Sequence, residues 1–188
     1  MTGGFSSDTR VGGVGPVDVG PGGVGPVDTG GLIRRLASGG ATVACAESVT
    51  GGRLIAALTS VTGSSAVVRG AVVAYATDLK VSLLGVDQAV LAAQGPVCAD
   101  VAEQMADGIR LRLGATYGLA TTGEAGPDSA SGRPVGTVHV AAAGPHATRT
   151  RLLELSGDRE KIQGAAVLAA LKLLAEVVDA GLPSRPGS

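Results

Sequence analysis

Twelve residues, 43–54, constrain the fold of this chain more than any other stretch. The β-prone run 42–46 ends in Glu47 and Ser48, two glycines follow, and apolar residues at helical spacing begin at Leu54. This order predicts a strand, a tight turn and a helix start. Glycines let the backbone approach a ligand closely, and the free N–H groups of a helix start can hold an anion. Ser48 is therefore a candidate nucleophile, and the alternative is that it caps the helix.

Composition limits the kind of protein that this chain can be. Its 188 residues suffice for one domain with a sizeable core, and the net charge of −1 with no basic block gives no support for binding nucleic acid or a membrane surface. No apolar run of about 18 residues predicts a membrane span, and the N-terminus has no secretory pattern. Cys45 and Cys98 match neither a metal spacing nor a disulfide framework, so we expect a reduced, cytoplasmic setting.

The first 30 residues differ in composition from the rest of the chain. The heptapeptide Gly-Gly-Val-Gly-Pro-Val-Asp occurs at 12–18 and again at 22–28, which is too few copies for a repeat fold. Such a segment cannot bury enough surface to offset its ordering entropy. We therefore expect a disordered Gly-, Pro- and Val-rich tail at 1–30, a folded domain at 31–181 and a second disordered tail at 182–188.

Strands and helices alternate along the folded part, with one hairpin near the end. The expected strands are 42–46, 70–76 and 116–122, with a hairpin of 135–143 and 148–155. The expected helices start near Leu32, cover 53–61 and 79–94 with a break at Gly85, run from a cap at Cys98 to Leu113, and cover 159–180 after a cap at Asp158. This order predicts a layered α/β domain with a mixed sheet. Ligands bind such sheets beyond the strand ends.

A serine nucleophile needs a base, and the sequence offers few. His139 lies in the middle of an expected strand and His146 at a hairpin tip, so a Ser-His-acid triad is not favoured. Lys80 is the one lysine of three that follows a strand end. A desolvated lysine can act as a base if its pKa falls by about three units. Tyr75 could relay or orient a proton; the alternative for Lys80 is an ordinary surface lysine.

A second glycine-rich loop follows the expected third strand. Thr122, Gly123 and Gly126 offer a hydroxyl and backbone donors, and together with Thr50 and Gly51 they could bind substrate and form an oxyanion hole. The alternative is a plain glycine-proline turn. No P-loop or dinucleotide-binding pattern is present, and nothing in the sequence calls for a cofactor or a metal.

Taken together, these residues resemble the CinA C-terminal domain family, whose known activity is nicotinamide-nucleotide amidase. The resemblance covers about 32–178 and rests on the order and spacing of seven pieces: AESVTGG (46–52), TGSSA (62–66), YATDLK (75–80), LLGV (83–86), TTGEAGP (121–127), RPVGTV (133–138) and GDRE (157–160). It implies a three-layer α/β/α domain with a mixed, mostly parallel five-stranded sheet. It also implies hydrolysis of the carboxamide of nicotinamide mononucleotide to nicotinate mononucleotide and ammonia, without a metal. By this likeness Ser48 is the nucleophile, Lys80 its base, and Tyr75 and Thr122 are site partners.

The chain also departs from the family pattern. Val49 stands where the family usually has Cys, the run 76–79 differs, and Glu124 stands where Ile is frequent. An acid at this position is expected to repel a phosphorylated substrate, and Arg53 and Arg133 are the candidates for holding a phosphate. Two alternatives therefore stay open: a non-catalytic nucleotide-binding module of the same fold, and a related small-amide hydrolase. We expect a small-molecule nucleotide as partner, and a homo-oligomer because the surface is rich in Ala and Val.

Overall fold

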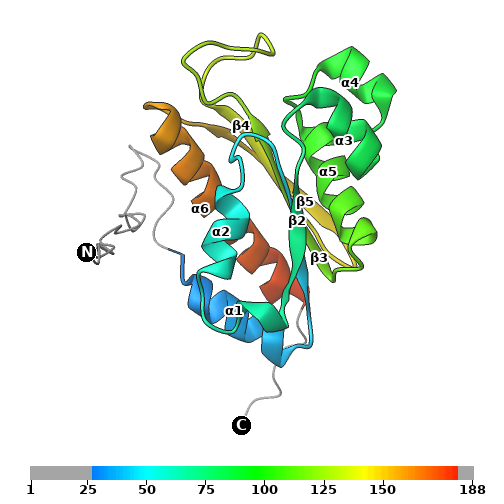
Figure 1. Cartoon of the computed structure of the whole chain (residues 1–188), viewed down its shortest axis with the longest axis vertical. Helices are drawn as coiled ribbons and strands as arrows, with labels where there is room; N and C mark the ends of the chain where they lie inside the picture. Colours follow the sequence, from blue (N-terminus) through cyan, green and yellow to red (C-terminus); the bar gives the residue numbers. More distant parts are fainter. Residues whose placement is uncertain (1–26, 182–188) are drawn as a thin grey trace, which may run out of the picture.

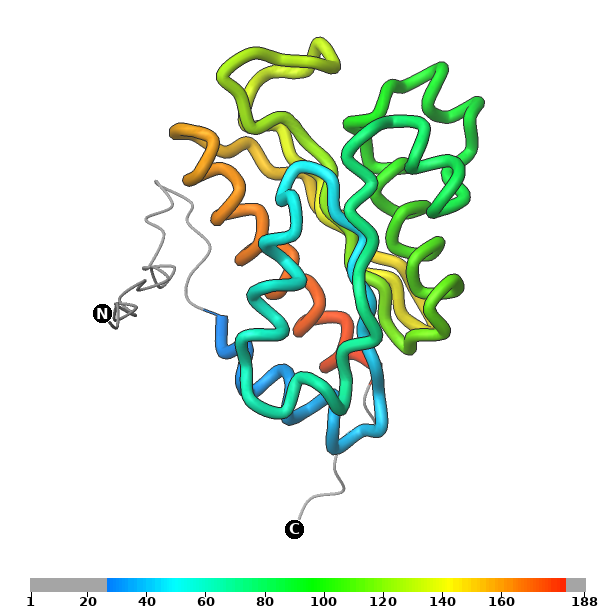
Figure 2. Tube along the Cα trace, viewed as in Figure 1, coloured from blue at the N-terminus to red at the C-terminus, as the bar shows by residue number. Residues whose placement is uncertain are grey.

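The computed structural model of the chain describes residues 27–181 (Figures 1 and 2), which form one five-stranded sheet between two layers of helices. The strands are β1 (Val43–Glu47), β2 (Val68–Val73), β3 (Tyr117–Gly123), β4 (Thr137–Ala143) and β5 (Thr148–Glu154). The helices are α1 (Thr29–Ser38), α2 (Arg53–Thr59), α3 (Thr77–Leu84), α4 (Gln88–Gln94), α5 (Ala99–Arg112) and α6 (Arg159–Gly181), with a short 3₁₀ turn at Ser64–Ala66.

Each face of the sheet has its own apolar core. Helices α1, α2 and α6 cover one face, and α3, α4 and α5 cover the other, as Figure 1 shows. All five residues of β1 are buried, as is usual for a central strand that is covered on both sides. No helix within residues 27–181 is long and apolar enough to cross a bilayer.

The sheet is mixed, in the order β2-β1-β3-β4-β5. Strand β1 pairs in parallel with β2 and β3, whereas β3 with β4 and β4 with β5 pair antiparallel. The expected α/β/α fold with a mixed five-stranded sheet is confirmed. The sheet is evenly divided rather than mostly parallel, because the β4–β5 hairpin lies beside β3 and adds two antiparallel pairs.

Two glycines allow α5 to pack unusually close to its neighbours. A Cβ at Gly118 on β3 would lie 1.9 Å from the carbonyl oxygen of Ala106 on α5, and a Cβ at Gly108 on α5 would lie 1.8 Å from the carbonyl oxygen of Leu84. Larger residues at these positions would push α5 away from the sheet and from α3. Close packing of this kind suits a core of small residues with few aromatic side chains.

Strand β2 differs from the expected 70–76. It starts at Val68 and ends at Val73, because the register shift between Val43 and Ala44 leaves Arg69 as an extra residue in the pairing of β1 with β2. What the sequence presents as an interruption at Arg69 and Gly70 is thus a bulge inside the strand. Tyr75 consequently lies in the link to α3 and not in the sheet.

Most other expected boundaries agree with the structure within a few residues. The break at Gly85 is confirmed, because Gly85 ends α3 with a φ of 72° and α4 begins at Gln88. Cys98 occupies the N-cap position of α5, although its side chain makes no capping hydrogen bond, and the Asp158 side chain accepts the N–H of Lys161 at 2.9 Å at the start of α6. The expected tails at 1–30 and 182–188 fall almost entirely outside the described residues.

Helix α1 begins before the expected domain boundary at residue 31. Its first residue is Thr29, and the Asp28 side chain accepts the backbone N–H of Gly31 at 2.7 Å. Residues 28–30 therefore belong to the folded domain, because an Asp before a helix satisfies one of its free N–H groups.

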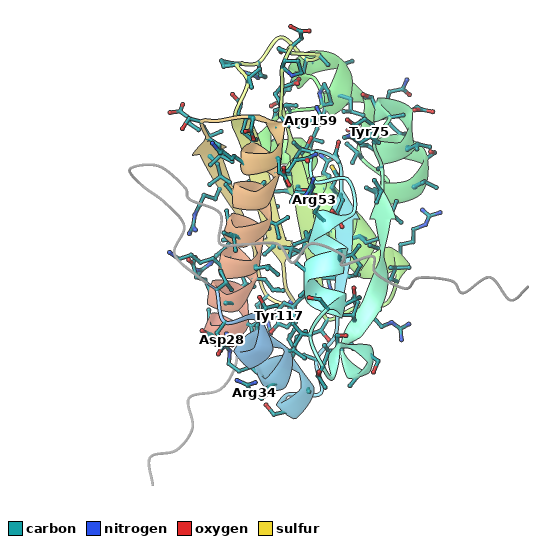
Figure 3. The ribbon with its side chains drawn as sticks, turned by 60° about the vertical axis from the view of Figure 1, so that its left-hand side comes forward. Asp28, Arg34, Arg53, Tyr75, Tyr117 and Arg159 are labelled. Atoms are coloured by element: carbon teal, nitrogen blue, oxygen red, sulfur yellow. The ribbon has the colours of Figure 1, made fainter. Side chains whose placement is uncertain are left out.

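We predict that Asp28→Ala lowers the melting temperature by about 2–4 °C, because loss of a helix cap costs about 1 kcal/mol in a chain of this size. Arg34→Ala is the matched control, since Arg34 contacts the same carboxylate at 3.7 Å in an exposed pair but leaves the cap intact (Figure 3). A melting temperature of Asp28→Ala equal to that of Arg34→Ala would contradict the capping role.

Candidate active site

The carboxyl ends of the three parallel strands meet at one edge of the sheet, and the candidate nucleophile lies there. Ser48 directly follows β1, and its N–H continues the pairing with β3 by donating to the carbonyl oxygen of Thr121 at 3.0 Å. The Nζ of Lys80, on α3, donates to the Oγ of Ser48 at 3.0 Å. The two residues that the sequence singles out as nucleophile and base are therefore in direct contact.

Lys80 is buried rather than a surface residue. Only 1% of it is exposed, and its Nζ also donates to the carbonyl oxygen of Ala74 at 2.8 Å. No carboxylate forms an ion pair with it within residues 27–181. Burial lowers the pKa of Lys80 from 10.5 to about 8, because desolvation disfavours the charged ammonium. A lysine with this pKa can take up and return a proton near neutral pH.

Glu47 holds the turn that carries Ser48. Its carboxylate is fully buried and accepts four hydrogen bonds, from the Thr50 hydroxyl at 2.7 Å and from the backbone N–H groups of Gly52, Leu54 and Ile55 at 2.9, 3.1 and 2.8 Å. It thereby caps α2 from the strand side, and the helix dipole favours a negative charge there. Ser48 is not the cap of α2.

This arrangement corrects the expected roles of the helix start. The N–H groups of α2 are not available to an anion, because Glu47 accepts them. Thr50 is fully buried, and its Oγ1 lies 2.7 Å from Glu47 and 2.8 Å from the Oγ1 of Thr121. Neither Thr50 nor Gly51 lines the cavity beside Ser48, and the Thr50 hydroxyl belongs to the hydrogen-bond network that supports the turn.

A cavity of about 230 Å³ opens beside Ser48 and Lys80. Thr122, Gly123 and Gly126 line it as expected. The hydroxyl of Thr122 donates to the carbonyl oxygen of Pro96 at 2.7 Å, which fixes the wall between β3 and the segment before α5. The structure therefore brings Ser48, Lys80 and the loop after β3 to one cavity.

Tyr75 and Arg159 form the rim of this cavity (Figure 3). Tyr75 is 59% exposed, and its hydroxyl accepts a hydrogen bond from Nη2 of Arg159 at 2.6 Å. The Nη1 of Arg159 donates to the carbonyl oxygen of Gly126 at 2.7 Å. Tyr75 thus lies at the site as expected, but its hydroxyl is engaged with Arg159, an arrangement that gives no support to a proton relay.

Arg159 is the cation at the rim that the sequence did not single out. Arg53 and Arg133, the expected phosphate ligands, do not line the cavity, and Arg53 lies 3.9 Å from Glu160 in an exposed pair. A signal for Arg159 was present in its motif, GDRE, at the start of the last helix. Gln163, on the same helix, was also missed; its Nε2 donates to the carbonyl oxygen of Val49 at 2.8 Å and ties the Ser48 turn to α6.

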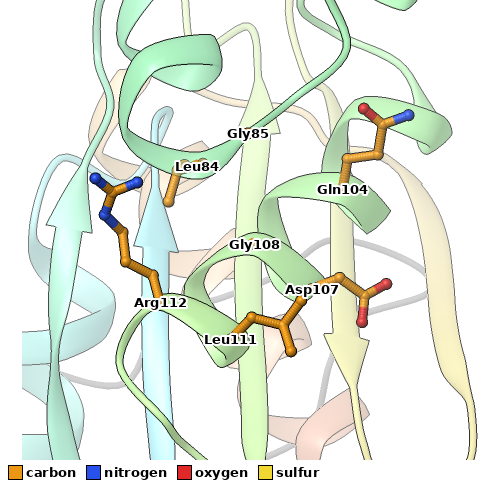
Figure 4. Close-up of a pocket in the computed structure, with 7 residues that line it drawn as sticks. All are labelled: Leu84, Gly85, Gln104, Asp107, Gly108, Leu111 and Arg112. Carbon is orange, nitrogen blue, oxygen red and sulfur yellow. The ribbon is translucent and has the colours of Figure 1, made fainter.

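Within residues 27–181, neither the Cys45 thiol nor the hollow beside α5 forms a competing site. Burial and the charge of Glu47 raise the pKa of the Cys45 thiol, so it is not a nucleophile at neutral pH. A larger hollow of about 570 Å³ lies between α3 and α5 (Figure 4) and is lined by residues such as Leu84, Asp107 and Leu111. It has no nucleophile with an adjacent base, which leaves the Ser48 cavity as the candidate active site.

We predict that Glu47→Ala lowers the free energy of unfolding by about 3–5 kcal/mol, since it leaves several buried donors without an acceptor. Chemical denaturation measures this change. Glu160→Ala is the control, because Glu160 is exposed and its pair with Arg53 is long, so its loss should cost less than about 1 kcal/mol. Equal effects of the two substitutions would show that Glu47 does not hold the turn.

Comparison with known proteins places this site in a family. Residues 29–178 match the family described as CinA C-terminal domain. A CinA-like protein of Frankia casuarinae is 50% identical over 155 residues, which are 82% of this chain and 36% of that protein, and one of Gloeobacter violaceus is 48% identical over 72% of this chain and 32% of its own length. The chain thus spans about a third of the length of the curated relatives that it matches.

The crystal structure of competence/damage inducible protein CihA from Agrobacterium tumefaciens is 37% identical, with a TM-score of 0.75 over 82% of this chain and 97% of that one. Competence damage-inducible protein A from Klebsiella pneumoniae is 31% identical, with a TM-score of 0.77 over 83% of this chain and 100% of that one. The chain belongs to the CinA C-terminal domain family.

Proposed function

We propose that the protein hydrolyses the carboxamide of nicotinamide mononucleotide to nicotinate mononucleotide and ammonia, in the recycling of pyridine nucleotides. The observation that carries this proposal is the contact of 3.0 Å between the buried Lys80 amine and the Ser48 hydroxyl at an open cavity. The choice of substrate comes from the resemblance to the family, and the choice of reaction class comes from the Ser–Lys pair.

In the first half of the reaction, neutral Lys80 takes the proton of the Ser48 hydroxyl, and Oγ attacks the carboxamide carbon. The resulting oxyanion needs hydrogen-bond donors. Val49 lines the cavity, and its N–H donates no hydrogen bond within residues 27–181, so this N–H is the first candidate. The C–N bond then breaks, Lys80 returns its proton to the leaving nitrogen, and ammonia departs from an acyl-enzyme ester on Ser48.

In the second half, water replaces ammonia. Lys80 takes a proton from the water, and the resulting hydroxide attacks the ester carbon. The C–O bond to Ser48 breaks and Oγ recovers its proton from Lys80. The carboxylic acid that forms loses its proton to solvent and leaves as the carboxylate. One lysine thus serves both halves, because its pKa of about 8 lets it hold and release a proton at working pH.

Arg159 is our candidate for the phosphate end of the substrate. A guanidinium carries five N–H donors and suits phosphate geometry. Arg159 uses two of its nitrogens to reach Tyr75 and Gly126 at the cavity rim, which orients the group toward the opening. The absence of nucleic-acid and membrane partners, the homo-oligomer and the cytoplasmic setting stay predictions.

The alternative is a non-catalytic nucleotide-binding module of the same fold. The Ser48–Lys80 contact favours turnover, because a module that only binds has no need of a desolvated lysine against a serine. Release of ammonia from nicotinamide mononucleotide by purified protein, with Ser48→Ala as the negative control, separates the two. Binding without any ammonia would establish the binding module, and release from other small amides alone would point to a related hydrolase.

We predict that Lys80→Arg is nearly as damaging to kcat/KM as Lys80→Met, with losses of about a hundredfold or more. Arginine keeps the positive charge but does not give up its proton, so it cannot act as the base for Ser48. Lys80→Met keeps the length and the apolar stem, and thermal melting of both variants checks that the domain is folded. Activity of folded Lys80→Arg close to wild type would reassign Lys80 to holding a phosphate.

The pH dependence provides an independent test. Because the neutral amine is the active form, kcat/KM should rise about tenfold per pH unit below the lysine pKa of about 8 and level off above it. The measurement is kcat/KM between pH 6 and 9 under conditions in which the protein stays folded. A flat profile across this range would exclude Lys80 as the base that titrates.

A further inference from the structure

The loop between β3 and β4, residues 124–136, forms one wall of the active-site cavity and holds a hydroxyl with no partner. Ala125, Asp128 and Ser131 line the cavity from this loop. The Oγ of Ser131 is buried, yet it has no hydrogen-bond partner within residues 27–181. A buried hydroxyl without a partner is uncommon and unfavourable. This oxygen has almost no accessible surface, so a rotation of the side chain toward the cavity is needed before a ligand can supply the missing partner.

Glu124 fixes where this hydroxyl lies. The residue is 7% exposed, and its carboxylate accepts the backbone N–H of Ser131 at 2.7 Å and that of Ala130 at 3.2 Å. The base of the loop is closed separately, because the N–H of Glu124 donates to Thr137 and its carbonyl accepts the N–H of Gly136. The carboxylate therefore acts on the far part of the loop, where Ser131 lies.

We propose that Ser131 binds the substrate through its hydroxyl and that Glu124 is the positioning residue that holds it at the cavity wall. The proposal rests on the proposed function for its substrate, nicotinamide mononucleotide, whose carboxamide, ribose and phosphate are all hydrogen-bonding groups. It also gives Glu124 a role other than the expected repulsion of a phosphorylated substrate, since both carboxylate oxygens face loop N–H groups.

Two substitutions separate the hydroxyl from its support. Ser131→Ala removes the hydroxyl but keeps the backbone N–H that Glu124 accepts, so the loop stays tethered. Glu124→Ala keeps the hydroxyl but releases the loop. The matched control is Asp128→Asn, which removes a negative charge from the same loop and cavity; Asp128 makes no hydrogen bond or ion pair within the described part of the chain.

The first measurement is hydrogen exchange of the loop in the full chain, which needs no substrate. Glu124→Ala should speed exchange at the amides of residues 130 and 131 by about tenfold, while Ser131→Ala and Asp128→Asn should not. Unchanged exchange in Glu124→Ala, with an unchanged melting temperature, would overturn the positioning role.

The second measurement is binding of nicotinamide mononucleotide by calorimetry in the Ser48→Ala background, together with KM and kcat in the active protein. Ser131→Ala should weaken binding and raise KM by about tenfold, with kcat changed by less than about threefold. Glu124→Ala should have a similar effect, and the double variant should add nothing to either single variant, because Glu124 acts through Ser131. If charge governed binding instead, Asp128→Asn and Glu124→Ala would both tighten it.

The outcomes keep this inference apart from the proposed function. Wild-type protein that binds the nucleotide, releases no ammonia and loses affinity in Ser131→Ala would refute the amidase but support the role of Ser131. Protein that releases ammonia with an unchanged KM in Ser131→Ala would support the amidase and overturn the inference. Absence of both binding and turnover would overturn both.

Discussion

The buried carboxylate of Glu47 is the interaction on which the rest of the site depends. It joins the end of β1 to the start of α2 through three backbone N–H groups, and through Thr50 it reaches Thr121 on β3. A carboxylate can be buried here because these donors and the helix dipole replace its water. Ser48 is the next residue in the chain, so its position follows from a network that spans two strands and a helix.

The same network keeps the acid away from the base. Had a carboxylate paired with Lys80, its charge would hold the amine protonated and raise its pKa. Glu47 instead directs both oxygens to α2 and Thr50, and within residues 27–181 the Lys80 amine hydrogen-bonds only to the neutral Ser48 hydroxyl and the Ala74 carbonyl. Desolvation then acts on the lysine without compensation, which is why its pKa falls to about 8. Because the two groups are separated, a lysine can serve as the base for a serine without a histidine.

Sequence reasoning reached the parts of the site that depend on local pattern. Ser48 and Lys80 follow the ends of two neighbouring parallel strands, β1 and β2, and strand ends at one edge bring such residues together. It did not predict hydrogen bonds between distant segments. The sequence assigned Thr50 to the substrate, but its hydroxyl is hydrogen-bonded to that of Thr121, 71 residues away. Arg159 likewise donates to the hydroxyl of Tyr75, 84 residues away. The register of β2 was missed for a related reason, because a bulge is defined by the partner strand and not by the strand itself.

Glu47 and Glu124 make the same kind of hydrogen bond, but the segments that they hold are packed differently. Both are buried carboxylates that accept backbone N–H groups. Glu47 acts between packed layers, where its four hydrogen bonds reinforce a core that already holds the elements together. Glu124 acts on a loop that has no helix packed behind it in Figure 1. Its two hydrogen bonds and that of Arg159 to Gly126 are the side-chain hydrogen bonds that hold this wall within residues 27–181. Ser48 therefore lies on the side of the cavity that packed layers support, whereas the opposite wall is a loop held by fewer side-chain hydrogen bonds. Substitutions in that loop can alter the cavity without disturbing the Ser48–Lys80 contact.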